Sequence, residues 1–147
     1  MERKLIIRNF GAIASADIAL KDFNIFIGEQ GAGKSTVAKL ITIFENRRDK
    51  VLKVDSDYLM TKFSEYNIIS YFNPDSYISY SSEQGDITYE DGSFNFTFSY
   101  HSTSHNLYIP AERFFISTFS RSIATLVLSK APIPVTLLES INIWYKF

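Results

Sequence analysis

The 147-residue sequence contains no cysteine, so it can form neither a disulfide bond nor a thiolate metal site. It also has no apolar run of 18 residues and no signal-peptide pattern, so we expect no membrane contact and a cytoplasmic location by default. The 15 basic and 16 acidic residues nearly cancel, and the positive charge of a dedicated nucleic-acid-binding protein is therefore missing. This length fits one domain or a large piece of one.

Histidine and glycine are scarce as well. The two histidines, His101 and His105, stand beside serines without a third ligand at suitable spacing, so we expect solvated side chains rather than a metal site. Three of the six glycines lie between residues 28 and 33.

This glycine-rich stretch reads Gly28-Glu29-Gln30-Gly31-Ala32-Gly33-Lys34-Ser35-Thr36, the G-x-x-x-x-G-K-[ST] pattern of a phosphate-binding (Walker A) loop. Glycines at this spacing let backbone N–H groups converge on phosphate oxygens, where a Cβ would interfere. The lysine then reaches the β- and γ-phosphates, the serine hydroxyl binds Mg²⁺, and the helix N-terminus adds positive potential. The predicted ATP-binding residues here are Gln30, Gly31, Ala32, Gly33, Lys34, Ser35 and Thr36, with Ser35 also the metal ligand.

The flanking sequence has the order that this motif requires. The apolar run 22–27 predicts a strand buried on both faces of a parallel sheet. After the loop, Val37, Leu40, Ile41 and Phe44 follow the spacing of an amphipathic helix. A Rossmann fingerprint is excluded, because its third glycine would fall on Thr36.

Two further regions predict antiparallel β structure. Residues 4–10 and 16–20 form a strand, a break at Gly11 and a returning strand, which we interpret as a hairpin before the loop. In residues 86–100, Asp91-Gly92 predicts a two-residue type I′ turn that places Tyr89 opposite Phe94 and Ile87 opposite Phe96. One face of that hairpin is aromatic and the other polar. Because residues 66–109 contain no Lys or Arg, the aromatic face is expected to be core rather than a nucleic-acid platform.

The stretches Ile7 to Gly11 and Phe26 to Thr36, separated by the predicted hairpin, resemble the N-terminal lobe of ABC-type ATPases of the SMC/RecF group, including AAA ATPases related to OLD-family proteins. The resemblance implies an α/β P-loop NTPase lobe with an inserted antiparallel β subdomain and C-terminal helices, here expected over residues 114–130 and 137–145. It also implies that Arg8 lies close to bound nucleotide, although an ordinary exposed strand arginine is an equal alternative.

The run Tyr108-Ile109-Pro110-Ala111-Glu112-Arg113 is similar to a segment of OLD-like ATPases where the chain returns toward the nucleotide. The resemblance implies that Glu112 and Arg113 could take part in catalysis, with Arg113 on the γ-phosphate or on a partner lobe. An equal alternative is that Glu112 and Arg113 only form structural ion pairs.

Two parts of this ATPase family have no counterpart in the chain. Residues 51–55 and 135–139 both fail as an uninterrupted apolar strand ending in a Walker B carboxylate, and no L-S-G-G-like signature occurs. We therefore expect residues 1–147 to be a partial ATPase domain, from a truncated or split gene product, that binds Mg·ATP and hydrolyses it poorly alone. The expected partners are the missing C-terminal half and a second copy, with nucleic acid reached only through an effector outside this chain.

Two other functions remain open. Asp55-Ser56-Asp57 resembles the acceptor-binding D-x-D of shikimate-kinase-like enzymes, which favours a small-molecule kinase, but paired acids after a helix are also typical of a solvated turn. Alternatively, the chain is a non-catalytic ATP-binding partner of a second polypeptide.

Overall fold

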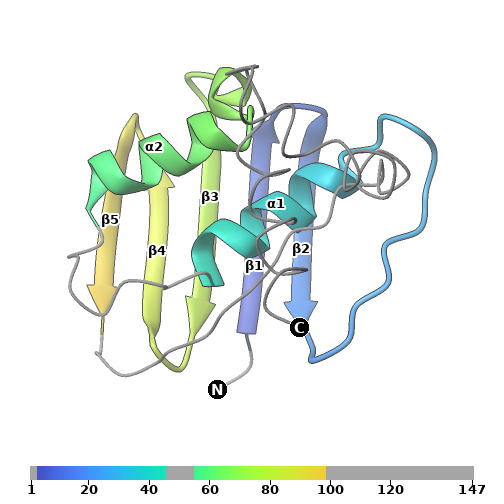
Figure 1. Ribbon diagram of the computed structural model, residues 1–147, viewed down its shortest axis with the longest axis horizontal. Helices are drawn as coiled ribbons and strands as arrows, with labels where there is room; N and C mark the ends of the chain where they lie inside the picture. The colour runs from blue at the N-terminus through green and yellow to red at the C-terminus, as the bar shows by residue number, and fades with distance from the viewer. Residues whose placement is uncertain (1–2, 46–54, 99–147) are drawn as a thin grey trace, which may run out of the picture. The chain divides into compact units, whose positions relative to one another are not determined.

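The computed structural model describes residues 3–45 and 55–98, and the described residues all belong to the unit Met1–Asn106. Five strands and two α-helices make up most of this part of the chain (Figure 1). In chain order the elements are β1 (Arg3–Phe10), β2 (Ile13–Leu20), α1 (Lys34–Glu45), α2 (Ser56–Glu65), a short 3₁₀ helix (Ile69–Tyr71), β3 (Tyr77–Ser82), β4 (Gly85–Glu90) and β5 (Ser93–Phe98).

The strands form one antiparallel sheet in the order β2-β1-β3-β4-β5. The first strand is therefore internal, pairing with β2 on one side and with β3 on the other, from Lys4 opposite Ser81 to Arg8 opposite Tyr77. The later strands thus extend the sheet that the first hairpin begins. The α/β class expected from the sequence is confirmed.

Both predicted hairpins are confirmed. In the second, Tyr89 pairs with Phe94 and Ile87 with Phe96, as the turn chemistry predicts. Asp91 (φ 51°) and Gly92 (φ 77°) both have the positive φ that a type I′ turn requires. The expected inner face is buried at Ile87, Tyr89 and Phe94, whereas Glu90, Asn95 and Thr97 of the polar face are exposed.

The first hairpin contains a change of face at Asn9. Leu5 and Ile7 are buried at alternate positions, and continued alternation would expose Phe10. Asn9 has a φ of 49°, a conformation that asparagine tolerates better than most residues. Phe10 is consequently buried together with Leu5 and Ile7.

Both helices lie against the same face of the sheet (Figure 1). Phe44 of α1 stacks on Tyr80 of β3, with ring centroids 5.6 Å apart. Phe63 of α2 makes an edge-on contact with Phe10 at 5.9 Å and contacts Phe94 at the same distance. The core between helices and sheet therefore contains a connected group of aromatic rings beside its aliphatic side chains.

Three features of the structure differ from the sequence predictions, and two predicted helices lie outside the described residues. Residues 22–27 form no strand: Phe23, Ile25 and Ile27 are 80%, 69% and 92% exposed, because no strand among the described residues pairs with them. Helix α2 was not predicted. In α1, Ile43 is buried and Ile41 only partly so, since the inward stripe is turned slightly from the predicted one. The predicted helices 114–130 and 137–145 lie outside the described residues.

Candidate nucleotide-binding site

The glycine-rich loop connects the exposed run 22–27 to helix α1. Gly31 and Gly33 have φ angles of 83° and 84°, a left-handed backbone that side-chain-bearing residues rarely adopt. The backbone N–H of Ala32 donates to the Glu29 carbonyl at 3.3 Å, and the N–H of Val37 donates to the Gly33 carbonyl at 2.9 Å. The loop thus makes a tight turn and passes directly into the first turn of the helix.

The two left-handed glycines have different surroundings. A Cβ on Gly31 would meet nothing within 4 Å, whereas a Cβ on Gly33 would lie 2.5 Å from Cγ1 of Ile13. Gly33 is buried against the first residue of β2, so the end of the loop rests on the hairpin. The first of these glycines is needed for its backbone conformation alone, and the second also for close packing.

Lys34 bends back over the loop that precedes it. Its Nζ donates hydrogen bonds to the carbonyl oxygens of Gly28, at 2.8 Å, and Glu29, at 2.5 Å. Both contacts are exposed to solvent. The ammonium charge is therefore held at the loop, in a place that a ligand can reach.

The two hydroxyl residues after Lys34 point to different environments. Ser35 is exposed in the first turn of α1, whereas Thr36 is buried, with 5% of its surface exposed. The first turn of α1 contains no acidic residue that would offset the positive end of the helix dipole. Of this pair, Ser35 is the residue accessible to a metal ion, and Thr36 contributes to the core.

Arg8 is engaged within the first hairpin. Its Nη1 donates to the carbonyl oxygens of Ile7, at 2.9 Å, and Ala16, at 2.8 Å. The bond to Ala16 connects β1 with β2, so the partly buried guanidinium has a structural role. Its contact with nucleotide stays a prediction.

The Asp55-Ser56-Asp57 stretch begins helix α2. The Asp55 carboxylate accepts a hydrogen bond from the Tyr58 backbone N–H at 2.9 Å, and its extended backbone is that of an N-cap. Asp57 is exposed in the first turn, where a negative charge complements the helix dipole. The structure therefore gives this acidic pair a role in starting α2.

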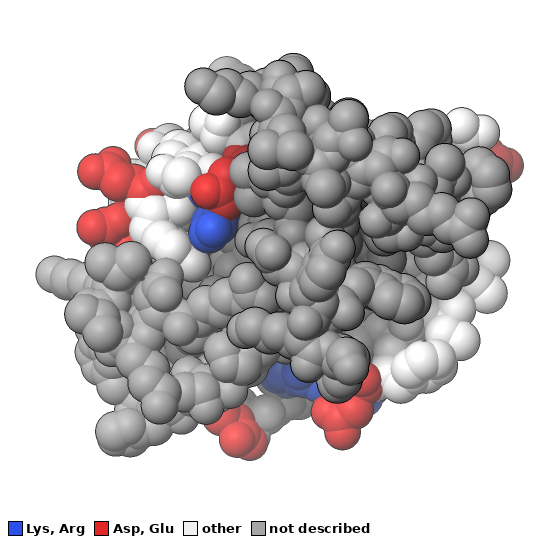
Figure 2. Space-filling model, viewed as in Figure 1, with Lys and Arg blue, Asp and Glu red and all other residues white. Residues whose placement is uncertain are grey.

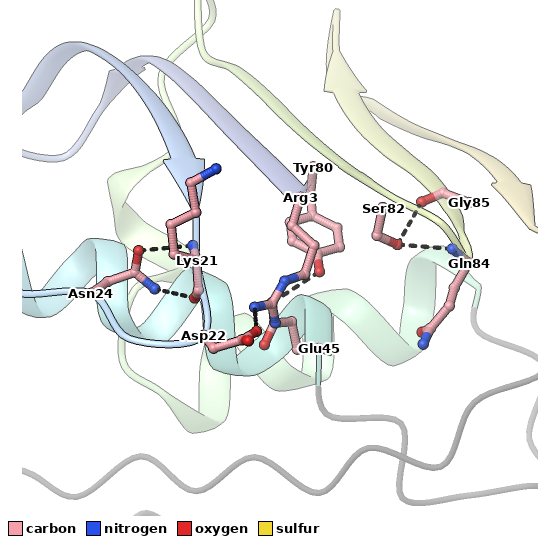
Figure 3. A network of polar contacts seen from close by, with 9 residues as sticks. All are labelled: Arg3, Lys21, Asp22, Asn24, Glu45, Tyr80, Ser82, Gln84 and Gly85. Carbon is pink, nitrogen blue, oxygen red and sulfur yellow. Dashed lines mark hydrogen bonds and ion pairs between the residues drawn. The ribbon is translucent and has the colours of Figure 1, made fainter. Parts of the chain in front are cut away.

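A polar cluster that sequence reasoning missed surrounds Arg3 at the start of β1 (Figure 3). Arg3 donates to Asp22 at 2.9 Å and to Glu45 at 3.3 Å, and the Tyr80 hydroxyl donates to the same Glu45 oxygen at 3.0 Å. Next to this cluster, the Asn24 side chain exchanges two hydrogen bonds with the Lys21 backbone. No local pattern reveals the contacts of Glu45 with Arg3 and Tyr80, because these partners lie 42 and 35 residues away in the sequence.

Four other residues considered in the sequence analysis lie outside the described residues: Glu112, Arg113, His101 and His105. Within the described ranges, no group of three or more acidic, histidine or cysteine side chains could hold a metal ion. On the face shown in Figure 2, the visible basic side chains of the described residues form no continuous patch. No described helix has the length and apolar character needed to span a membrane.

A glycine loop that leads into a helix N-terminus, with a lysine held at the loop, places this α/β chain in the class of P-loop nucleotide-binding proteins. Comparison with known families agrees: residues 1–130 match the family described as AAA ATPase domain, and the chain belongs to that family. No curated protein and no solved structure matches the chain.

Proposed function

We propose that the chain binds Mg·ATP through residues 28–36. The observation that carries this proposal is the loop with two left-handed glycines and the Lys34 ammonium held over it at the start of α1. Membership of the AAA ATPase domain family supports nucleotide binding. The loop contains the features that a polyphosphate requires, namely backbone donors without Cβ atoms, a cation and a helix N-terminus.

Each residue of the loop has a distinct proposed part. Lys34 exchanges the carbonyl oxygens of Gly28 and Glu29 for phosphate oxygens, which are stronger acceptors because they are charged. The exposed Ser35 hydroxyl holds Mg²⁺, which neutralises phosphate charge when bound. Gln30, Gly31 and Gly33 present backbone N–H groups, and the Ala32 N–H exchanges its long bond to the Glu29 carbonyl for one to phosphate. Thr36 supports the loop from the core.

At a finer level, we propose the N-terminal lobe of an SMC/RecF or OLD-like ATPase, in which Arg8, Glu112 and Arg113 approach the nucleotide. Hydrolysis then requires a Walker B carboxylate and a signature segment from another half, with a homodimer closing around ATP. The kinase alternative has less support, since Asp55 caps α2.

The test is Mg·ATP titration of the purified chain and its Lys34→Ala variant. Loss of a charge-assisted contact to phosphate is expected to weaken affinity about 10- to 100-fold. Lys39→Gln is the matched control, because Lys39 lies on the same helix and its Nζ donates to the Tyr66 carbonyl at 2.9 Å instead. Wild-type affinity in Lys34→Ala would remove the proposed site.

The hydrolysis proposal has its own measurement. The chain alone is expected to release almost no phosphate from ATP, and turnover is expected on addition of a polypeptide that supplies the missing carboxylate strand. Acceptor-dependent ATP consumption that disappears in Asp57→Ala would instead establish the kinase alternative.

A further inference from the structure

The polar cluster around Arg3 joins the two flanks of the proposed nucleotide loop. Asp22 stands six residues before Gly28, at the start of the leading segment, and Glu45 is the last residue of α1. Both carboxylates accept from the one guanidinium (Figure 3). A single side chain of β1 thus contacts the chain on either side of the loop.

The strengths of these contacts differ with burial. The Glu45 side chain is 12% exposed, and the same oxygen accepts from Arg3 and from the Tyr80 hydroxyl. Asp22 is fully exposed, so solvent and salt screen its contact with Arg3. The persistent part of the cluster is therefore Arg3, Glu45 and Tyr80, which fixes the last turn of α1 to β1 and β3.

The opposite end of α1 is fixed differently. Gly33, directly before the helix, is packed against Ile13 of β2. A helix of 12 residues is about 18 Å long. The sheet therefore holds this helix at both ends, by close packing beside the loop and by the polar cluster at the far end.

We propose that Arg3, Glu45 and Tyr80 are positioning residues for nucleotide binding, an inference that rests on the proposed function. They touch no ligand. By holding α1 against the sheet, they keep its N-terminus and Lys34 in the orientation that receives phosphate. Without them the helix has more freedom, and nucleotide binding must then order it at a cost in affinity.

The experiment compares Mg·ATP dissociation constants of wild type, Arg3→Gln, Tyr80→Phe and the double variant. Tyr80→Phe keeps the ring that stacks on Phe44 and removes only the hydroxyl, so its fold is retained. Each single change is expected to weaken affinity about three- to tenfold. Because both donors act on one Glu45 oxygen, the double variant should lose less than the product of the two effects.

Lys4→Gln is the matched control. Lys4 is the neighbour of Arg3 on β1 and forms an ion pair with Asp17 of β2 at 3.0 Å, which does not involve α1. It should bind Mg·ATP within about twofold of wild type. Arg3→Lys should recover part of the affinity, because a single ammonium keeps the charge but lacks the forked geometry of guanidinium.

Amide hydrogen exchange of the nucleotide-free proteins tests the positioning role separately from the proposed Mg·ATP binding. Arg3→Gln and Tyr80→Phe are expected to accelerate exchange in residues 34–45, and Lys4→Gln is not. Wild-type affinity together with wild-type exchange in both variants, or equal effects in Lys4→Gln, would overturn the positioning role. A lower melting temperature with unchanged affinity would also overturn it, by showing a merely structural role. If wild type itself bound no Mg·ATP, the proposed function would fail, and accelerated exchange would still show that the cluster holds α1.

Discussion

Strands β3 to β5 and the segment that leads into the glycine loop are both rich in apolar side chains, yet they have opposite surroundings. In the hairpin of β4 and β5, the side chains of Ile87 and Phe94 are only 2% and 8% exposed. In the leading segment, Ile25 and Ile27 are 69% and 92% exposed. The difference shows that apolar composition gives a segment a preference for burial, whereas a pairing partner decides whether the preference is met.

The β4–β5 hairpin has its pairing partner nearby in the sequence, whereas no described strand pairs with residues 22–27. A two-residue turn brings β5 onto β4, so the hydrogen bonds of both strands are satisfied within a short stretch of chain. Residues 22–27 follow β2, which lies at one end of the strand order, and no described strand continues the sheet beyond it. Substitutions in the packed core and in residues 22–27 test this contrast.

The largest effect is expected at Phe63, which is fully buried and contacts the rings of Phe10, Phe72 and Phe94. Phe63→Ala should lower the free energy of unfolding by about 3 to 5 kcal/mol, through lost burial and a residual cavity. Urea denaturation measures it, with the 44% exposed Ile69, changed to alanine, as the control. A loss below about 1 kcal/mol would contradict the packed aromatic core.

The next effect is expected at the end of the glycine loop, where Gly33 meets Ile13 of β2. Gly33→Ala should lower the free energy of unfolding by about 2 to 4 kcal/mol, because backbone strain and overpacking add. Gly31→Ala has a similar φ but open surroundings, and should cost about 1 kcal/mol. Adding Ile13→Ala should reduce the penalty of Gly33→Ala, and an unchanged penalty would argue against the close packing.

A smaller effect is expected at the start of α2. Asp55→Ala should lower the free energy of unfolding by about 1 kcal/mol, since the Tyr58 N–H loses its acceptor. Asp55→Ser should restore most of it, because serine is also a good N-cap. Asp57→Ala should lower the free energy of unfolding by less. Thermal unfolding of the three variants measures these effects. Equal losses at both positions would contradict the capping assignment.

The smallest effect is expected in the exposed segment. Ile27→Ser should change the free energy of unfolding by less than about 0.5 kcal/mol, because the side chain is almost fully exposed. The matched change is Ile87→Ser in the packed hairpin, which should be strongly destabilising. A comparable loss at both positions, measured by urea denaturation, would remove the contrast between the two regions.

The sequence allows the local parts of this fold to be predicted. Both hairpins, including the cross-strand pairs of Tyr89 and Ile87, follow from turn chemistry and alternation, which depend on neighbouring residues. The glycine loop and the helix after it follow from a motif whose spacing reflects phosphate chemistry. These features need no knowledge of distant contacts.

The remaining features depend on contacts between distant residues. The strand predicted for residues 22–27 is wrong for the described structure because no described strand pairs with it. Helix α2 was missed although Asp55, Leu59 and Phe63 carry its signal, a cap followed by apolar residues four apart. The pairing of β1 with β3 and the cluster at Glu45 join residues tens of positions apart, which no periodicity reveals.

The turn at Asp91 and Gly92 offers a practical consequence for labelling the protein. Both residues are exposed, and a Cβ on Gly92 would meet nothing within 4 Å. Exposed tips of this kind tolerate insertions better than the strands they join. Since the chain has no cysteine, a single cysteine in a short insertion there would carry one dye at one known place.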